Sequence, residues 1–174
     1  MRKIAIFNQS DQMALLGACQ SDHEYIPIWL MMRCGMHPSD VSRAKDNITF
    51  SGDFMEYRRA KNQKPMRIMI PKDLKPRLEK WLKSGRKISR EGYFHLVRRV
   101  GIRINHPECT PMSLRHTFCI EELRRYMKML RPPPDYMFLL AKRMGCGVEI
   151  VRQNYIDLEQ WEGIGEESDG KEPS

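Results

Sequence analysis

The feature that most constrains the fold of this 174-residue chain is a single region of β-prone sequence. It consists of three short runs, at 48–50, 55–58 and 66–70, separated by turn-forming residues at 51–53 and 61–65. Runs so close in sequence are typical of an antiparallel sheet. Because the remainder has helical periodicity, the sequence predicts an α+β fold that is mainly helical with a small three-stranded antiparallel sheet.

Helical patterns occupy the rest of the chain, with capping residues or prolines at their starts. The expected helices begin near residues 10, 22, 38, 74, 90, 111, 136 and 148. In the helix expected over about residues 90–100, Phe94, Val97 and Val100 should face inward. Arg98 and Arg99 should face solvent, where they could track phosphates or simply form a solvated helix face.

The helix that begins at Thr110-Pro111 has the clearest start signal in the chain. Thr110 can accept a hydrogen bond from an unpaired backbone N–H as the N-cap, and proline suits the first helical position. Four apolar residues then form a stripe that one side of the helix can bury: Leu114, Phe118, Ile120 and Leu123. Arg115 lies about one turn into the helix, near the end where anions are favoured.

The charge distribution indicates a polyanionic partner. The whole chain has a formal net charge of +8, but residues 159–174 carry −5, so residues 1–158 carry +13. An excess of this size favours nucleic acid, although a basic globular protein without such a partner has the same composition. The acidic segment from residue 161 onward has a disordered composition, which gives a predicted domain at 1–160 and a tail at 161–174.

Other classes of protein are disfavoured by sequence. No apolar run reaches membrane-spanning length, and the N-terminus does not have a signal-peptide pattern. The five cysteines form no C-x-x-C pair, which is typical of free thiols in a reducing compartment rather than of zinc ligands. No phosphate-binding or dinucleotide-binding glycine motif is present. We therefore expect an intracellular, cytoplasmic protein without a metal or a nucleotide cofactor.

Two separated stretches resemble one known family. Residues 110–118 read T-P-M-S-L-R-H-T-F, and residues 143–155 read R-M-G-C-G-V-E-I-V-R-Q-N-Y. Together they resemble the catalytic domain of tyrosine recombinases, the integrases of phages and mobile elements. In that family a histidine precedes the nucleophilic tyrosine by nine residues, and here Cys146 precedes Tyr155 by nine. The resemblance extends from about residue 10 to residue 155.

The resemblance implies roles for particular residues. Tyr155 would be the nucleophile and Arg115 one of two arginines that hold the phosphate. Lys61, in the hairpin after the second strand, would be the general acid, with Lys64 as the neighbour that the alignment could confuse with it. His37 occupies the place of the first arginine of the family, in the segment G-M-H-P-S-D-V at 35–41.

Three positions depart from the family pattern. Met112 and Cys146 stand where the family has histidines, and His37 stands where it has arginine. A histidine lacks the permanent charge and planar fork of arginine. His37 could instead cap the next helix, and Arg33, four residues earlier, could supply the missing charge.

The resemblance therefore implies a DNA-binding, site-specific recombinase or integrase domain that breaks and rejoins strands through a 3′-phosphotyrosine intermediate. It also implies self-association on double-stranded DNA, with a further domain or partner for binding the core site. The alternative is a catalytically decayed relative that acts only as a DNA-binding module. A helical RNA- or protein-binding domain is a third reading, which the ordered spacing of the motifs disfavours.

Overall fold

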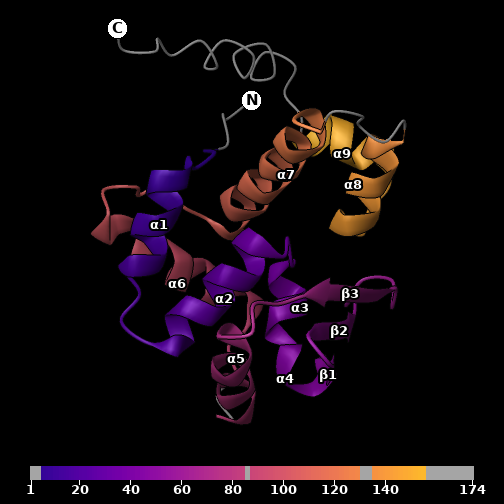
Figure 1. Cartoon of the computed structure of the whole chain (residues 1–174). Coiled ribbons are helices and arrows are strands. Elements are labelled where there is room, and N and C mark those ends of the chain that lie inside the picture. Colours follow the sequence, from indigo (N-terminus) through magenta and orange to yellow (C-terminus); the bar gives the residue numbers. More distant parts are fainter. Residues whose placement is uncertain (1–4, 85–86, 130–134, 156–174) are drawn as a thin grey trace, which may run out of the picture. The chain divides into compact units, whose positions relative to one another are not determined.

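The computed structural model describes residues 5–84, 87–129 and 135–155, which fall into two compact units that divide between Glu121 and Glu122 (Figure 1). The first unit contains α1 (Gln9–Gly17), α2 (Asp22–Arg33), α3 (Pro38–Ser42), α4 (Ala44–Asn47), β1 (Thr49–Ser51), β2 (Phe54–Arg58), β3 (Pro65–Met69), α5 (Leu74–Lys83), α6 (Arg90–Arg103) and the start of α7 (Pro111–Met127). The second contains the end of α7, α8 (Tyr136–Met144) and α9 (Val148–Tyr155). The domain boundary predicted at residue 160 lies outside the described residues.

The three strands form one antiparallel sheet, as predicted, and their order in it is β1-β2-β3. The central strand pairs on both sides, with Met55 opposite Phe50 of β1 and Ile68 of β3. Alternation along β2 buries Met55 and Tyr57, whereas Arg58 is exposed. The chain reverses through left-handed residues at Gly52, with φ 60°, and at Gln63, with φ 56°.

The core of the first unit is built around α2. Its apolar residues include Ile26, Ile28, Leu30 and Met31, each with 0% of its surface exposed. Helices α1, α3, α5 and α6 all pack against this helix. One helix that is apolar around most of its circumference therefore organises the unit, because its neighbours need to be apolar on only one face.

The inward face of α6 differs from the one that the sequence predicted. Val97 and Val100 are buried as expected, but Phe94 is 40% exposed, so that part of the prediction was wrong. Tyr93 and Leu96 complete the buried stripe instead. The spacing 93, 96, 97, 100 follows the helical period, and residue 94 lies beside this stripe rather than on it.

The short helix α4 was not predicted, and it joins α3 to the sheet. Ala44 is fully buried. The side chain of Asn47 donates to the backbone carbonyl of Arg58 and accepts from the backbone N–H of the same residue. This two-point contact satisfies both backbone groups at the end of β2, so α4 fixes the strand where the hairpin begins.

The predicted start of α7 is confirmed in detail. Ser113 donates its backbone N–H to Thr110 Oγ1 at 3.2 Å, and its hydroxyl accepts the N–H of Thr110 at 2.7 Å. This reciprocal pair is a capping box. All four residues of the predicted apolar stripe are buried: Leu114, Phe118, Ile120 and Leu123.

Gly35 lets α7 approach the end of α2 closely. Its φ of 64° lies in the left-handed region, and a Cβ built on it would lie 2.5 Å from Cδ1 of Phe118. Phe118 is only 4% exposed, so its ring is confined. A side chain at residue 35 would therefore meet both backbone strain and a ring that cannot swing away.

In the second unit, α8 and α9 are joined by a tight turn at Gly145, which has a φ of 63°. The backbone N–H of Cys146 donates to the carbonyl of Ala141 at 3.0 Å, which satisfies the end of α8. Leu140, Met144 and Val151 are fully buried. This turn fixes where α9 begins and hence the direction of the helix that ends at Tyr155.

None of the helices in the described parts of the chain is long and apolar enough to cross a membrane. No disulfide joins any of the five cysteines, all of which lie in the described ranges, and three of them, Cys34, Cys109 and Cys119, are buried.

Replacing Gly35 by alanine tests the close approach between α2 and α7. We expect Gly35→Ala to lower the free energy of unfolding by about 2–5 kcal/mol, since strain at positive φ adds to overpacking against Phe118. Gly52→Ala is the matched control, because Gly52 also has a positive φ but nothing lies within 4 Å of its Cβ position. It should cost only the backbone strain of about 1–2 kcal/mol. Equal losses in urea denaturation of the two variants would contradict the packing argument.

Candidate active site

Arg115 lies in the second turn of α7, and only 2% of its surface is exposed. Its Nη1 donates to the backbone carbonyl of Gly35, in the turn between α2 and α3. A guanidinium stays charged at any physiological pH, and its burial is costly unless polar groups surround it. The sequence predicted where Arg115 falls on α7; its burial and its tie to Gly35 come from the tertiary structure.

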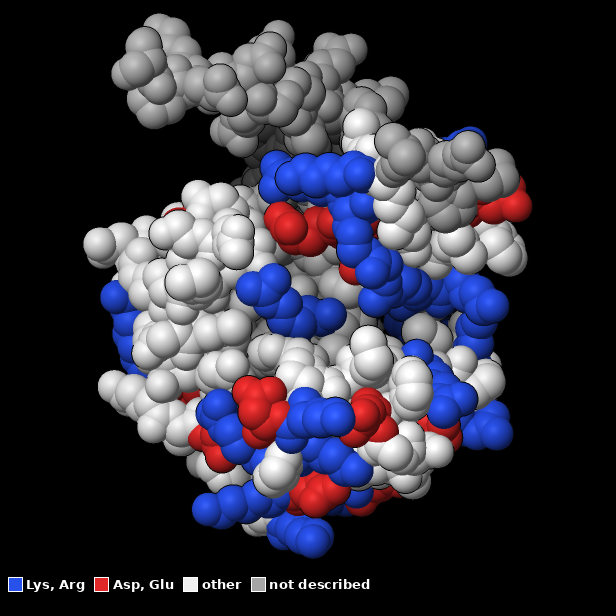
Figure 2. Space-filling view, viewed as in Figure 1, with Lys and Arg blue, Asp and Glu red and all other residues white. Residues whose placement is uncertain are grey.

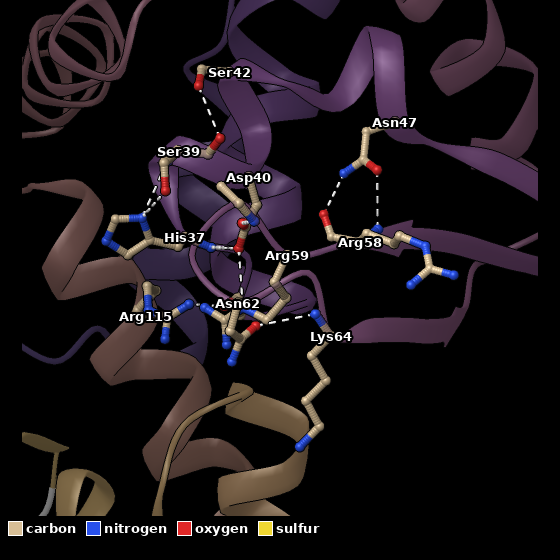
Figure 3. Close-up of polar contacts among 12 residues, drawn as sticks. His37, Ser39, Asp40, Ser42, Asn47, Arg58, Arg59, Asn62, Lys64 and Arg115 are labelled. Carbon is tan, nitrogen blue, oxygen red and sulfur yellow. Dashed lines mark hydrogen bonds and ion pairs between the residues drawn. The ribbon is translucent and has the colours of Figure 1, made fainter.

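Asp40 is the buried acid beside this arginine (Figure 3). Only 1% of its surface is exposed, and its Oδ1 accepts the backbone N–H of Ala60 at 2.7 Å. Its Oδ2 accepts the backbone N–H of His37 at 3.3 Å and lies 3.5 Å from Nε of Arg59. One carboxylate therefore joins the start of α3 to the start of the β2–β3 hairpin.

Arg59 is a site residue that the sequence reasoning missed. It follows the last residue of β2 and is only 7% exposed. The alternation that turns Met55 and Tyr57 inward also turns residue 59 inward. That period was the signal that could have found it, since an arginine at an inward strand position requires a partner such as Asp40.

His37 is the N-cap of α3. Its Nδ1 accepts the backbone N–H of Ser39 at 3.2 Å and lies 2.6 Å from the hydroxyl of the same serine. Its own backbone N–H bonds to Asp40, which completes a capping box. The helix-cap alternative for His37 is thus what the contacts show, and its contact with phosphate stays a prediction.

The charge state of His37 follows from its surroundings. Burial, together with the neighbouring guanidinium of Arg115, lowers the pKa of His37 to about 4. The ring is therefore neutral at neutral pH. With Nδ1 accepting from Ser39, the proton of the neutral ring lies on Nε2, so His37 offers a single uncharged donor.

The hairpin lysines occupy the exposed loop between β2 and β3. Both Lys61 and Lys64 are exposed, and the backbone N–H of Lys64 bonds to the side chain of Asn62 at 3.2 Å. The side chain of Lys64 extends away from Asp40 and His37 (Figure 3). Because Ala60 is held by Asp40, Lys61 is the lysine nearer in sequence to the buried cluster.

The other predicted residues are more dispersed. Arg33 is exposed at the end of α2, whereas Arg59 and Arg115 are buried, and Met112 is 42% exposed at the second position of α7. Cys146 is half-buried in the turn after Gly145. Tyr155 ends α9 as predicted, but its side chain lies outside the described part. The assembly of Tyr155 with Arg115 stays a prediction.

The basic face of α6 is partly occupied by internal ion pairs. Arg99 and Arg103 bind the buried Glu24 of α2, at 3.0 and 2.6 Å. The hydrogen bond from Arg103 is the main cause that lowers the pKa of Glu24 to about 2. Arg98 stays exposed with the outward orientation that the sequence predicted. Two of these arginines are therefore structural, which leaves fewer for contacts with a phosphate backbone.

Lysines and arginines are interspersed with acids around α4, α5 and the sheet, in the lower part of the view in Figure 2. Arg67 pairs with Glu56 at 3.3 Å, and Lys87 pairs with Asp46 at 2.8 Å. Such exposed pairs add little stability. They do reduce the local positive potential, so this region is a weaker polyanion-binding surface than the net charge suggests.

Within residues 5–84, 87–129 and 135–155, no group of three or more His, Cys, Asp or Glu residues is placed to hold a metal ion. The cluster of His37, Asp40, Arg59 and Arg115 carries one acid and two permanent cations. Its chemistry suits a phosphoryl or other oxyanion group rather than a cation.

Comparison with known proteins identifies the fold. No protein-family model matches the sequence, and no curated protein matches it. A solved structure, the crystal structure of XerA recombinase, is similar over 97% of this chain, with a TM-score of 0.72 and 12% sequence identity. The chain has the fold of a tyrosine recombinase. It spans 66% of the length of the XerA chain.

The recombinase fold confirms the predicted fold class, including the small sheet in a mainly helical chain. An identity of 12% shows the fold alone, so the role of each residue rests on geometry and chemistry. On those grounds the buried cluster on α3, α7 and the hairpin is the candidate active site of the first unit.

The buried His116 and the half-buried His37 predict how the stability of this recombinase fold depends on pH. Burial lowers the pKa values of His37 and His116 to about 4. The unfolded chain therefore takes up protons first, and stability should fall as the pH decreases from about 6.5 to about 4. His116→Gln should remove roughly 1–2 kcal/mol of that loss, as followed by urea denaturation at a series of pH values.

His95→Gln is the matched control, because His95 is exposed on α6. It should leave the pH dependence of the parent unchanged. Glu24 loses its contribution only below about pH 4.5, so its titration is separated from this window. A His116→Gln profile parallel to that of the parent between pH 6.5 and 4.5 would contradict the assignment.

Proposed function

We propose that this chain is the catalytic part of a site-specific DNA recombinase that breaks and rejoins strands through a tyrosine. The observation that carries the proposal is the burial of Arg115 beside Asp40 and His37, in a chain with the recombinase fold. A buried, permanently charged fork at a helix start is suited to one phosphoryl group of a DNA backbone. The ordered spacing from Lys61 to Arg115 to Tyr155 supports the same function.

The proposed reaction begins with attack by Tyr155. Its phenolic oxygen forms a bond to the phosphorus of a DNA phosphodiester, and the bond from phosphorus to the 5′ oxygen breaks. The products are a 3′-phosphotyrosine and a 5′-hydroxyl. A tyrosine has an unperturbed pKa of about 10, so loss of its proton needs a base or a strongly positive site. Attack by a second 5′-hydroxyl reverses the step, and the energy of the broken bond is conserved.

The residues of the first unit supply the remaining chemistry. Arg115 is a preorganised donor for the negative charge that develops on the phosphorane oxygens. Lys61 gives a proton to the leaving 5′ oxygen as a general acid. His37 can add one neutral hydrogen bond through Nε2. Fixed donors of this kind need no reorganisation when the charge appears.

The proposed partner is double-stranded DNA, with self-association of the chain on it. The cationic excess of the chain and the exposed Arg98 on α6 support this partner. Because the chain spans 66% of the XerA chain, we also propose that binding of a core site uses a further domain or a partner protein. Recombination of this type acts on intracellular DNA, so a cytoplasmic location is part of the proposal.

A second candidate function is DNA binding without strand cleavage. It is favoured by the departures from the family pattern at His37, Met112 and Cys146. Met112 is exposed and cannot donate a hydrogen bond, and His37 is committed to capping α3. Loss of one transition-state donor commonly lowers the rate by about 10²–10³. A relative that had lost several donors would keep the fold and the basic surface, and would bind DNA without cleaving it.

The nucleophile is tested with a nicked suicide duplex that traps the covalent intermediate. We expect the parent to form an SDS-resistant adduct, and Tyr155→Phe to form none while its affinity for the duplex stays within about twofold of the parent. Phenylalanine keeps the ring and removes only the attacking oxygen. An adduct that persists in the variant would remove Tyr155 from the role, and salt-dependent binding by a parent without any adduct would support the second candidate.

The hairpin lysines provide a paired test of the general acid. Lys61→Ala should slow adduct formation by about 10²–10³ with little change in DNA affinity, because the leaving oxygen loses its proton donor. Lys64→Ala is the matched control, since it removes the same charge three residues later on the same exposed loop. A duplex with a 5′-bridging sulfur should restore the rate of Lys61→Ala, since a thiolate leaves without an acid. The opposite ranking of the two variants would assign the role to Lys64.

A further inference from the structure

Two buried arginines in the first unit share one buried carboxylate. Arg59 and Arg115 are 7% and 2% exposed, and Asp40 is 1% exposed. With His37 neutral, these four side chains carry a net charge of +1. The charged groups that act on the His37 ring are one acid, Asp40, and three bases: Arg115, Arg90 and Arg59. The cluster therefore presents a positive field in a place with little solvent to screen it.

The two guanidinium groups come from different elements of the fold, and each has its own partner. Arg115 comes from α7 and donates to the carbonyl of Gly35. Arg59 comes from the end of β2 and meets Asp40 at Nε, at 3.5 Å. Asp40 is itself fixed by the backbone N–H groups of Ala60 and His37. Figure 3 shows His37, Asp40, Arg59 and Arg115 gathered at this junction.

A contact at Nε uses one edge of the guanidinium fork. The two Nη groups at its end carry the donors that match two oxygens of a phosphoryl group. The 3.5 Å separation from Asp40 is longer than the 2.7–2.9 Å of a charge-assisted hydrogen bond. The ion pair with Asp40 therefore orients the guanidinium of Arg59.

We propose that Arg59 and Arg115 together bind one phosphoryl group, with Arg59 supplying the cation that residue 37 does not. This inference rests on the proposed function for its biological ligand, a DNA phosphodiester. His37 then serves as the cap that positions Asp40, and Asp40 positions Arg59. The competing explanation is that Arg59 is only the counter-ion of Asp40.

The first experiment measures binding of inorganic phosphate to the whole chain, at constant ionic strength with chloride as the reference. Phosphate should raise the melting temperature of the parent in a saturable way. Arg59→Gln should weaken the fitted affinity for phosphate by about tenfold or more, because a charged donor is lost. Arg58→Gln is the matched control: Arg58 is the preceding residue, has the same charge and is exposed on the opposite side of β2. It should bind phosphate like the parent.

A double variant separates the two explanations and guards against misfolding. Arg59→Gln alone leaves a buried carboxylate without its arginine, which can unfold the unit. Arg59→Gln with Asp40→Asn removes both charges and keeps an amide oxygen for the N–H of Ala60. If Arg59 binds the anion, the double variant loses phosphate affinity as the single one does. If Arg59 only neutralises Asp40, the double variant binds phosphate like the parent, and the proposal is overturned.

Arg59→Lys gives a third readout in a variant that keeps the charge beside Asp40. Its ammonium lacks the planar fork, so phosphate affinity should fall by several-fold while the unfolding midpoint without phosphate changes little. A parent whose melting temperature does not respond to phosphate, or an Arg59→Lys variant with parental affinity, would overturn the proposal.

The suicide duplex distinguishes failure of this inference from failure of the proposed function. Phosphate binding that depends on Arg59 in a parent that forms no adduct would retain the anion site and reject the recombinase reaction. Adduct formation at the parental rate by Arg59→Lys and by the double variant would retain the reaction and reject the role of Arg59. The expected result is weaker phosphate binding and slower adduct formation in the Arg59 variants, with both properties unchanged in Arg58→Gln.

Discussion

The buried carboxylate of Asp40 is the interaction on which the candidate site depends. It accepts backbone N–H groups from His37 and Ala60 and pairs with Arg59, so it joins the start of α3 to the start of the hairpin. Burying a carboxylate is favourable only when such donors surround it. The carboxylate needs these donors to remain buried, and its position in turn fixes where the donors lie.

The neighbouring cap explains why a histidine is compatible with this site. His37 has its Nδ1 engaged by Ser39 and its ring held neutral by burial and by Arg115. A third cation here would repel the two arginines without a second acid to balance it. In this chain residue 37 is the N-cap of α3, and the buried cations near Asp40 are Arg59, which follows β2, and Arg115 on α7.

Local sequence signals predicted some elements and the residues on them well. The β-prone runs predicted the three-stranded antiparallel sheet, because closely spaced strands pair with their neighbours. Thr110, Pro111 and the stripe through Leu123 predicted α7, and the motif placed Arg115 on it. These signals depend on a few adjacent residues, so they can be recognised in the sequence without knowledge of tertiary contacts.

Other features depended on contacts that no local pattern contains. α4 is held by the link from Asn47 to Arg58, which joins residues eleven positions apart. Phe94 is exposed because the side of α6 that meets the core is the one that carries Tyr93 and Leu96. Arg59 was missed because its inward direction requires the register of β2, and the burial of Arg115 requires the approach that Gly35 allows.

The N-terminal arm has a mechanical consequence for this site. Phe7 is 1% exposed, its N–H donates to Thr117 Oγ1 at 3.0 Å, and its carbonyl accepts from Gln12. Thr117 is two residues from Arg115 on α7, so the arm is anchored to the helix that carries Arg115. Because this contact is buried, a displacement of the arm at Phe7 would act on α7. The arm and the candidate site are therefore mechanically linked through α7.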